Sequence, residues 1–401
     1  MIPVNEPLIG EKEIEYVNEC LRTGWISSAG RFIEEFEQKW AAYCGMKYGI
    51  AMSNGTTALQ AAVGCFDFEP GFQVIMPTFT IISCALAVIY NGGKPVLVDC
   101  DPRTWCMDVE QVKIKIENEI EKGDGKLKAI MPVHIYGHPV DMDPLMELAQ
   151  KYDLKIIEDA AEVHGAEYLT GRATTNPQWK RCGSFGHVSA FSFYANKLIT
   201  TGEGGMVLTN DAGLAEKARS LRNLCFRPEQ RFLHTELGHN FRLTNLQAAI
   251  GLAQIERIDE IVARKRWMGQ AYTECLKDTS GLQIPVEEPW AKQVYWMYGI
   301  VLDENTGLDA VQFAQKLKEK GVETRPFFLG MHEQPIFQTP PLPSPGGRDT
   351  GRGMFTAESY PVAERIARQG LYLPSGLTLT ENQMDYVSNS VSEVIGHKAV
   401  S

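Results

Sequence analysis

Short apolar runs alternate with helical segments through the first half of the chain. Each run is a nearly continuous stretch of apolar side chains, which is typical of a strand buried on both faces. Strands that alternate with helices favour a largely parallel sheet with helices on both of its sides. The sequence therefore predicts an α/β fold, with strands in residues 48–52, 74–77, 95–98, 127–133 and 154–157.

Polar and small residues follow several of these predicted strands. In open parallel sheets, ligands bind beyond the carboxyl ends of the strands. We therefore expect a binding site where these segments meet. The segments are residues 53–57, 77–80, 134–137 and 158–162.

A lysine lies between a later apolar strand and a loop that is almost free of side chains. The strand is Ala190–Phe193, the lysine is Lys197, the loop is Gly202–Gly205, and a further strand begins at Met206. Lysine is rarely buried without a partner. A desolvated lysine amine has a lowered pKa and reacts with aldehydes and ketones. Taken alone, Lys197 is explained more simply as a surface lysine, so the rest of the chain decides between the two interpretations.

The second part of the chain has a different organisation. Residues 242–272 are predicted as one long helix, and the pattern of strands and helices from residue 293 onward indicates a smaller α/β domain. A chain of 401 residues is long enough for two domains. We predict a large domain in residues 1–255 and a small C-terminal domain in residues 256–401, and we expect the N-terminal segment 1–25 to pack on the small domain.

Charge and composition exclude several classes of function. The net charge of −11 argues against a general nucleic-acid-binding surface. No apolar stretch is long enough to predict a membrane span, and the first residues lack the pattern of a signal peptide. The nine cysteines show no paired spacing and the histidines show no metal spacing, so we expect a cytoplasmic protein without disulfides or a metal site.

An acidic residue and a capped helix start complete a possible cofactor site. Asp159 ends a predicted strand, where it could pair with a protonated ring nitrogen or simply cap a helix. Residues 53–57 offer hydroxyl groups and a helix N-terminus, which suit a phosphate, although plain capping explains them as well. Pyridoxal phosphate needs a lysine, an acidic partner for its pyridine nitrogen and a phosphate site. Lys197, Asp159 and residues 53–57 together therefore point to pyridoxal phosphate.

Five motifs resemble, in sequence and in order, those of the DegT/DnrJ/EryC1/StrS family of sugar aminotransferases. They are residues 54–59, 158–162, 191–197, 202–205 and 242–248. The resemblance extends from Trp25 to about residue 375. It is closest to the GDP-perosamine synthase branch, through residues 23–28, 99–104, 131–137 and 251–257.

This resemblance implies a fold and an assembly. The fold is that of fold-type I pyridoxal phosphate enzymes, which is similar to aspartate aminotransferase. It has a large domain with a mostly parallel seven-stranded sheet and a smaller C-terminal α/β domain. The resemblance also implies a homodimer in which each active site contains residues of both subunits.

The resemblance assigns roles to individual residues. Lys197 would bind the cofactor aldehyde covalently, Asp159 would pair with the pyridine nitrogen, and Ala161 would lie against one face of the ring. Glu162 stands where relatives often have glutamine, which reaches the phenolic oxygen. The residues expected to hold the phosphate are Gly55, Thr56, Ser192 and, from the partner subunit, Asn245.

The implied reaction is transfer of the amino group of L-glutamate to a keto sugar. The favoured acceptor is a nucleotide-linked 4-keto-6-deoxyhexose, for the synthesis of amino sugars in surface polysaccharides such as lipopolysaccharide. Alternatives are an 8-oxo octulosonate, which would give 8-amino-Kdo, and a 3-keto sugar. A non-catalytic regulatory protein that binds pyridoxal phosphate is a further alternative. A nicotinamide dehydrogenase is disfavoured because no G-x-G-x-x-G motif follows the early strands.

The sequence departs from the family pattern in several places. Many relatives have an aromatic residue at the position of Ile81, so Phe79 is the candidate here for stacking on the cofactor ring. Segments 169–183 and 339–353 look longer than their counterparts and could border the sugar site or be surface insertions. The candidates for contacts with the sugar nucleotide are Arg325, His332, Arg227 and Arg231.

Overall fold

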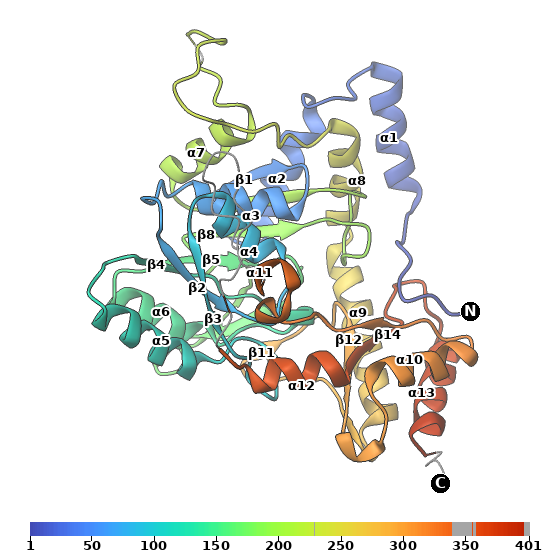
Figure 1. Cartoon of the computed structure of the whole chain (residues 1–401). Coiled ribbons are helices and arrows are strands. Elements are labelled where there is room, and N and C mark those ends of the chain that lie inside the picture. The colour runs from blue at the N-terminus through green and yellow to red at the C-terminus, as the bar shows by residue number, and fades with distance from the viewer. Residues whose placement is uncertain (228, 339–354, 356–357, 397–401) are drawn as a thin grey trace.

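A seven-stranded sheet forms the centre of the larger part of the molecule (Figure 1). The computed structural model describes residues 1–227, 229–338, 355 and 358–396. The strand order is β1-β9-β8-β5-β4-β2-β3. Only β9 runs antiparallel to its neighbours within this described sheet, which confirms the predicted α/β class with a mostly parallel sheet. The strands are β1 (Tyr48–Met52), β2 (Gln73–Pro77), β3 (Lys94–Val98), β4 (Leu127–Ile130), β5 (Lys155–Asp159), β8 (Val188–Ser192) and β9 (Gly205–Thr209).

The central strand β8 shows how the sheet is buried on both sides. Phe191 and the following Phe193 pack against Trp40 of one covering helix, with ring centroids 5.0 and 5.1 Å apart. Ser192, between them, lies against Gly55 at the start of another helix. Because successive side chains of a strand point to opposite faces, helices cover both faces of the sheet here.

The large domain contains seven helices before residue 223 among the described residues. Several begin at a side-chain cap: Asn54 accepts from the backbone N–H of Thr57, and Asp108 caps α5. α5 is absent from the predicted elements, although Val112 and Ile116 form its buried face. The helices are α1 (Glu11–Thr23), α2 (Arg31–Tyr43), α3 (Gly55–Gly64), α4 (Ser83–Tyr90), α5 (Val109–Glu121), α6 (Met142–Lys151) and α7 (Ala212–Arg222), with a short 3-10 helix at Ile135–Gly137.

The long helix predicted for residues 242–272 is two helices. α8 (Asn245–Ile255) ends before Glu256, and α9 (Ile258–Leu276) begins after Arg257, whose φ of −123° is not helical. The Glu256 carboxylate binds the ammonium groups of Lys12 on α1 and Lys39 on α2, each at 2.6 Å. The prediction of one helix is therefore wrong, and the break coincides with contacts to distant helices.

The C-terminal part of the chain has its own sheet and its own cluster of buried side chains. The strand order is β10-β12-β14-β13, and all pairs are antiparallel. The division at residue 255 stays a prediction. The elements are β10 (Leu282–Gln283), β12 (Tyr298–Leu302), α10 (Ala310–Glu319), β13 (Arg325–Pro326), α11 (Pro335–Gln338), α12 (Pro361–Gln369), β14 (Gly370–Leu373) and α13 (Glu381–Gly396), with short 3-10 helices at Glu304–Thr306 and Met331–Glu333.

The first residues of the chain lie along this small domain, and Figure 1 shows the N-terminus beside α10 and α13. Ile2 forms a parallel bridge with Val322 and packs against the buried cluster of the small domain. The backbone N–H of Ser375 donates to the Val4 carbonyl at 2.8 Å. No helix in the described part of the chain is long and apolar enough to cross a bilayer.

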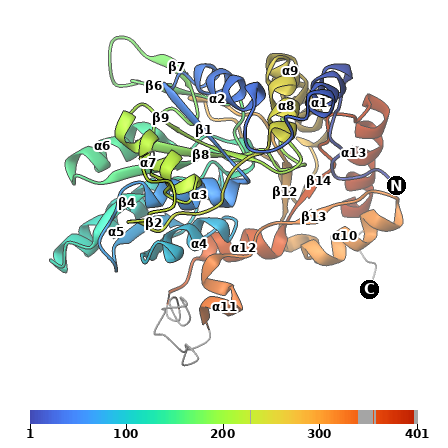
Figure 2. The same cartoon turned by 90° about the horizontal axis from the view of Figure 1, so that it is seen from above.

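Segment 169–183 contributes to a small third sheet. β6 (Glu167–Thr170) and β7 (Gln178–Arg181) form an antiparallel hairpin, and β6 also pairs with β11 (Ala291–Lys292). Figure 2 shows β6 and β7 beside α2, at the edge of the molecule. Segment 339–353 lies outside the described residues.

Candidate active site

A cavity of about 640 Å³ opens beyond the carboxyl ends of β5 and β8. Its walls come from the start of α3, the segment after β2, the turn after β8 and the small domain. The structure brings most of the predicted site residues together here. They are Gly55, Thr56, Asp159, Ala161, Glu162, Ser192 and Lys197.

Lys197 lies on the turn between β8 and β9, and its side chain is 9% exposed. The turn is closed by backbone hydrogen bonds, because the N–H of Thr201 donates to Phe193 O and the N–H of Phe193 donates to Gly204 O. The Nζ atom of Lys197 lies 3.6 Å from Glu162 Oε1. Burial lowers the pKa of Lys197, and Glu162 and Asp159 act in the opposite direction. Lys197 is therefore not a surface lysine.

Glu162 is the nearest counter-ion of Lys197. Its Oε2 atom accepts the backbone N–H of Tyr136 at 2.8 Å. Burial raises the pKa of Glu162 to about 7, although Lys197 lowers it. A buried amine and a buried carboxyl of this kind can exchange a proton near neutral pH.

Asp159 ends β5, and both of its carboxylate oxygens have a donor. Oδ1 accepts the backbone N–H of Ala161, and Oδ2 accepts the thiol of Cys84, each at 3.0 Å. Burial raises the pKa of Asp159, and the hydrogen bond from Cys84 lowers it. The carboxylate is thus held in one orientation at the cavity wall.

The start of α3 forms a cradle with Ser192. A Cβ atom at Gly55 would lie 2.7 Å from Ser192 Cβ, so glycine alone fits between the helix and the strand. The hydroxyl of Thr56 is hydrogen bonded to Ser83 at 2.8 Å. Free backbone N–H groups at a helix start and neighbouring hydroxyls bind phosphate well.

A second acidic residue, Glu158, stabilises the sheet next to Asp159. Its carboxylate accepts backbone N–H groups of residues 183, 185 and 186 and the Nε2 proton of His134. His134 Nδ1 accepts the backbone N–H of Val140, which fixes this tautomer. Glu158 and His134 are fully buried and have a structural role.

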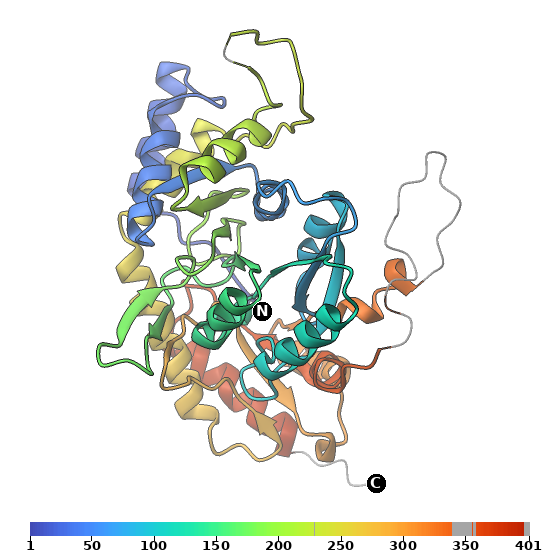
Figure 3. The same cartoon turned by 90° about the vertical axis from the view of Figure 1, so that its left-hand side faces the viewer.

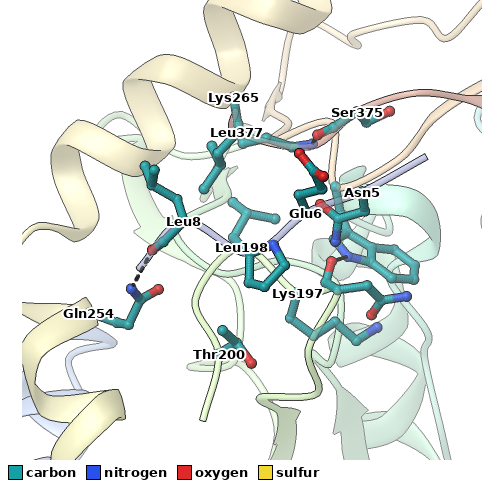
Figure 4. A pocket seen from close by; sticks show the side chains of 13 residues that line it. Asn5, Glu6, Leu8, Lys197, Leu198, Thr200, Gln254, Lys265, Ser375 and Leu377 are labelled. Atoms are coloured by element: carbon teal, nitrogen blue, oxygen red, sulfur yellow. Dashed lines mark hydrogen bonds between the residues drawn. The ribbon is translucent and has the colours of Figure 1, made fainter. Parts of the chain in front are cut away.

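A much smaller cavity, of about 10 Å³, lies behind Lys197. Figure 4 shows Lys265 and Glu6 on one side of it and Lys197 on the other. The Lys265 ammonium is buried and donates to the carbonyl of Ser375. Burial lowers the pKa of Lys265 to about 7. The space is large enough for one water molecule.

Asn245 does not line the cavity of its own chain. It is buried, its Oδ1 accepts the N–H of Phe32, and its Nδ2 donates to Trp25 O and Cys20 Sγ. The contact of Asn245 with the phosphate in a partner subunit stays a prediction. Its amide holds the segment between α1 and α2.

The structure does not support the prediction that Phe79 stacks on the cofactor ring. Its side chain is fully buried among Tyr136, Phe327 and Phe328, at centroid distances of 5.7 to 6.0 Å, and it does not line the cavity. Ile81 lines the cavity instead. An aliphatic side chain therefore occupies the place predicted for an aromatic stack.

Two residues predicted to contact the substrate, Arg325 and His332, do not line the cavity. Arg325 is exposed on β13 and pairs with Glu323 at 2.6 Å. His332 is buried, with Nδ1 bonded to Thr78 at 2.7 Å and Nε2 at 3.4 Å from Glu364. Neither side chain lines the cavity, and their contact with the substrate stays a prediction.

Arg227 and Arg231 lie outside the cavity as well. Both are exposed, and Arg231 lies over the rings of Phe226 and Phe232. Figure 3 shows residues 229–238 projecting from the molecule. The hairpin of segment 169–183 also lies away from the cavity, so its proposed place at the sugar entrance is not supported.

Three residues that act on the cavity were not among the predicted site residues: Trp296 lines it, and Cys84 and Tyr136 donate hydrogen bonds to its carboxylates. Cys84 follows Thr80 by one helical turn, so the predicted cluster at residues 77–80 could have pointed to it. Tyr136 belongs to the predicted cluster 134–137 and contributes its backbone N–H. Trp296 comes from the small domain, and no local pattern of the sequence indicates it.

The residues of the cavity fit pyridoxal phosphate. The backbone N–H groups at the start of α3, with the hydroxyls of Thr56 and Ser192 in the same cavity, suit its phosphate, and the Asp159 carboxylate suits its pyridine nitrogen. The Lys197 amine lies in the same cavity and suits its aldehyde. All three groups that the cofactor requires therefore line one space.

Comparisons with known proteins agree with this arrangement. The sequence profile described as the DegT/DnrJ/EryC1/StrS aminotransferase family matches residues 7–392. The chain is 40% identical over 395 residues to the GDP-perosamine synthase of Caulobacter vibrioides, covering 98% of both chains. It is 37% identical over 397 residues to the GDP-perosamine synthase of Escherichia coli O157:H7, covering 99% of both.

A solved structure has the same fold. The chain is similar to a DegT DnrJ EryC1 StrS aminotransferase from Brucella abortus, with a TM-score of 0.83 and 28% sequence identity. The match covers 96% of this chain and 95% of the other. It therefore includes both sheets and the cavity between them.

Proposed function

The chain belongs to the DegT/DnrJ/EryC1/StrS aminotransferase family and uses pyridoxal phosphate, and we propose that it transfers the amino group of L-glutamate to C4 of a nucleotide-linked 4-keto-6-deoxyhexose. The observation that carries this substrate is the 40% identity to a GDP-perosamine synthase over 98% of both chains. GDP-4-keto-6-deoxymannose is thus the first acceptor to test.

Lys197 is the reactive amine in this proposal. Bound pyridoxal phosphate supplies an aldehyde that captures amines and a ring that takes up electrons. Lys197 would hold that aldehyde, and once L-glutamate had displaced it, the freed amine would move the proton at the reacting carbon. Its burial supports this role, because burial lowers the pKa of the amine and a desolvated lysine amine reacts as a nucleophile.

Asp159 and Glu162 hold the ring in place. Asp159 keeps a proton on the ring nitrogen, since the Cys84 thiol and the Ala161 N–H leave its carboxylate fixed at the wall. Glu162 would contact the phenolic oxygen and store a proton beside Lys197, 3.6 Å away. Gly55, Thr56 and Ser192 bind the phosphate at the start of α3.

The proposal includes a cytosolic homodimer. Figure 1 shows two projecting segments at the top of the molecule, residues 229–238 and the chain between α1 and α2. Phe232 and Leu237 are 83% and 92% exposed on one projection, and Trp25 and Ile26 are exposed on the other. Exposed apolar side chains of this size mark interaction surfaces, and a second copy of the chain would cover them.

A half-reaction tests the donor and the acceptor separately. The protein is loaded with pyridoxal phosphate, converted with L-glutamate and freed of the glutamate. Keto sugars are then offered one at a time while the absorbance of the lysine-bound cofactor is followed. Return of this absorbance with GDP-4-keto-6-deoxymannose alone is the expected result.

Two other outcomes would change the proposal. Return with a different oxidised sugar, such as an 8-oxo octulosonate or a 3-keto sugar, would contradict the acceptor and leave the transamination intact. No conversion by L-glutamate would contradict the donor and favour a non-catalytic role. Lys197→Ala is the control, because without this amine borohydride should fix no cofactor to the chain.

A further inference from the structure

Trp296 places an aromatic ring against the reactive amine. The Nζ atom of Lys197 lies 3.4 Å from the centroid of the Trp296 ring. Trp296 is 5% exposed and precedes β12, so it reaches the cavity from the small domain. The face of an indole ring attracts a cation, and this attraction is strongest where water is excluded.

The same side chain also holds the backbone next to Lys197. The indole N–H donates to the carbonyl of Asn196 at 2.7 Å. Asn196 directly precedes Lys197 on the turn between β8 and β9. One side chain of the small domain therefore fixes both the turn and the end of the lysine.

Trp296 is one of several side chains that surround the Lys197 amine. It also separates the large cavity from the small one behind it, because it lines both. Burial of the amine favours its neutral form, whereas the nearby carboxylates favour the ammonium. The titratable groups around Lys197 are Glu162, Asp159, Cys84, Glu203, Tyr194, Tyr372, Glu6, Lys265 and His164.

We propose that Trp296 is a positioning residue for the free Lys197 amine. Its ring holds the ammonium at the small-domain wall of the cavity, and its N–H fixes the turn that carries the lysine. The amine then has a defined resting place whenever it is not bonded to the cofactor. The proposal rests on Lys197 as the reactive amine, but its test involves no turnover, so it can fail independently of the proposed reaction.

The first measurement is the titration of Lys197 in the full-length protein without cofactor. Competitive acetylation at a series of pH values, followed by peptide mass spectrometry, gives the pH at which this amine is half charged. In Trp296→Leu we expect this midpoint to fall by about one pH unit, a tenfold change in the ratio of the two forms. Trp296→Phe keeps an aromatic face and should shift it by less than half as much.

The opposite shift would overturn the proposal. If Trp296 only keeps water out, its removal hydrates the ammonium and the midpoint rises. An unchanged midpoint in Trp296→Leu would also contradict a contact between ring and ammonium. The conservative Phe variant guards against a Leu variant that fails to fold.

Hydrogen exchange tests the second contact. The indole N–H is lost in both variants, so the amides of residues 194–199 should exchange at least threefold faster in both. Trp105→Phe is the matched control, because Trp105 is equally buried and packs on Phe327 without lining the cavity. Unchanged exchange in Trp296→Phe would remove the proposed role of the N–H.

Discussion

At the scale of single residues, the Glu162 carboxylate is the main group that keeps Lys197 charged. It lies 3.6 Å from Nζ and raises the pKa of Lys197 against the effect of burial. In Glu162→Gln we therefore expect the pKa of Lys197 to fall by about one unit. Competitive acetylation of the cofactor-free protein measures this pKa.

The control for this prediction is Glu203→Gln. Glu203 lines the same cavity but forms no ion pair with Lys197. A fall of the Lys197 pKa in both variants would show a general effect of the charge in the cavity. A rise of this pKa in Glu162→Gln would contradict the ion pair between Glu162 and Lys197.

Cys84 should set the pH range in which the cofactor binds. Its thiol lowers the pKa of Asp159, so in Cys84→Ala the pKa of this carboxyl rises further above its usual value. Asp159 then loses its charge at a higher pH as the solution is acidified. We expect pyridoxal phosphate to bind roughly threefold to tenfold more weakly at pH 6 and almost normally at pH 8.

Fluorescence titration with pyridoxal phosphate measures this change. Cys84→Ser restores a donor and should restore the affinity at pH 6. Cys65→Ala is the control, since Cys65 is buried on the far side of α3 and donates to Leu214 O. Equal losses in the Ala and Ser variants would show that only packing is disturbed.

The sequence predicted the residues that lie within continuous motifs. Lys197, Asp159, Gly55 and Ser192 each belong to a short pattern, and the structure places them in one cavity. Trp296 was not predicted because its contacts with Asn196 and Lys197 cross about a hundred positions of the chain. The sequence also does not show that the amide of Asn245 is hydrogen bonded to Phe32 and Trp25 of its own chain.

At the scale of elements, the contact between α3 and β8 depends on Gly55, which has no side chain. Gly55→Ala would place a Cβ atom 2.7 Å from Ser192 Cβ, so the helix start must move away from the strand. We expect a loss of about 1–3 kcal/mol in the free energy of unfolding and at least tenfold weaker binding of pyridoxal phosphate.

Urea unfolding and cofactor titration test this prediction together. Gly396→Ala is the control, because a Cβ atom there meets nothing within 4 Å. Weak cofactor binding with unchanged stability would contradict the steric explanation, since both effects come from the same displacement.

The elements themselves were predicted where local pattern decides them. Apolar residues make up most of β8 and β9, and α2 has one apolar face, so their positions were confirmed. The break between α8 and α9 was missed because no proline or glycine marks it. Glu256 stands at the break and pairs with Lys12 and Lys39, which are distant in sequence.

At the scale of the whole molecule, the exposed apolar side chains of Phe232 and Leu237 should determine whether the chain forms a homodimer. In the double variant Phe232→Asp and Leu237→Asp, two charges replace side chains that are 83% and 92% exposed. If a second copy covers them, the wild type sediments as a dimer and the variant as a monomer.

Sedimentation velocity distinguishes the two species. Val311→Asp is the matched control, because Val311 is 75% exposed on α10 of the small domain. A monomeric wild type would contradict the homodimer, and a dimeric double variant would place the interface elsewhere.

The wall that Trp296 forms has a consequence for the order in which the site is assembled during synthesis. The turn that carries Lys197 is closed by β8 and β9, which are neighbours in sequence and can pair early. Trp296 emerges from the ribosome about a hundred residues later. We therefore expect nascent chains that stop before residue 296 to contain the lysine turn without its small-domain wall. Stable capture of the cofactor would then follow completion of the small domain.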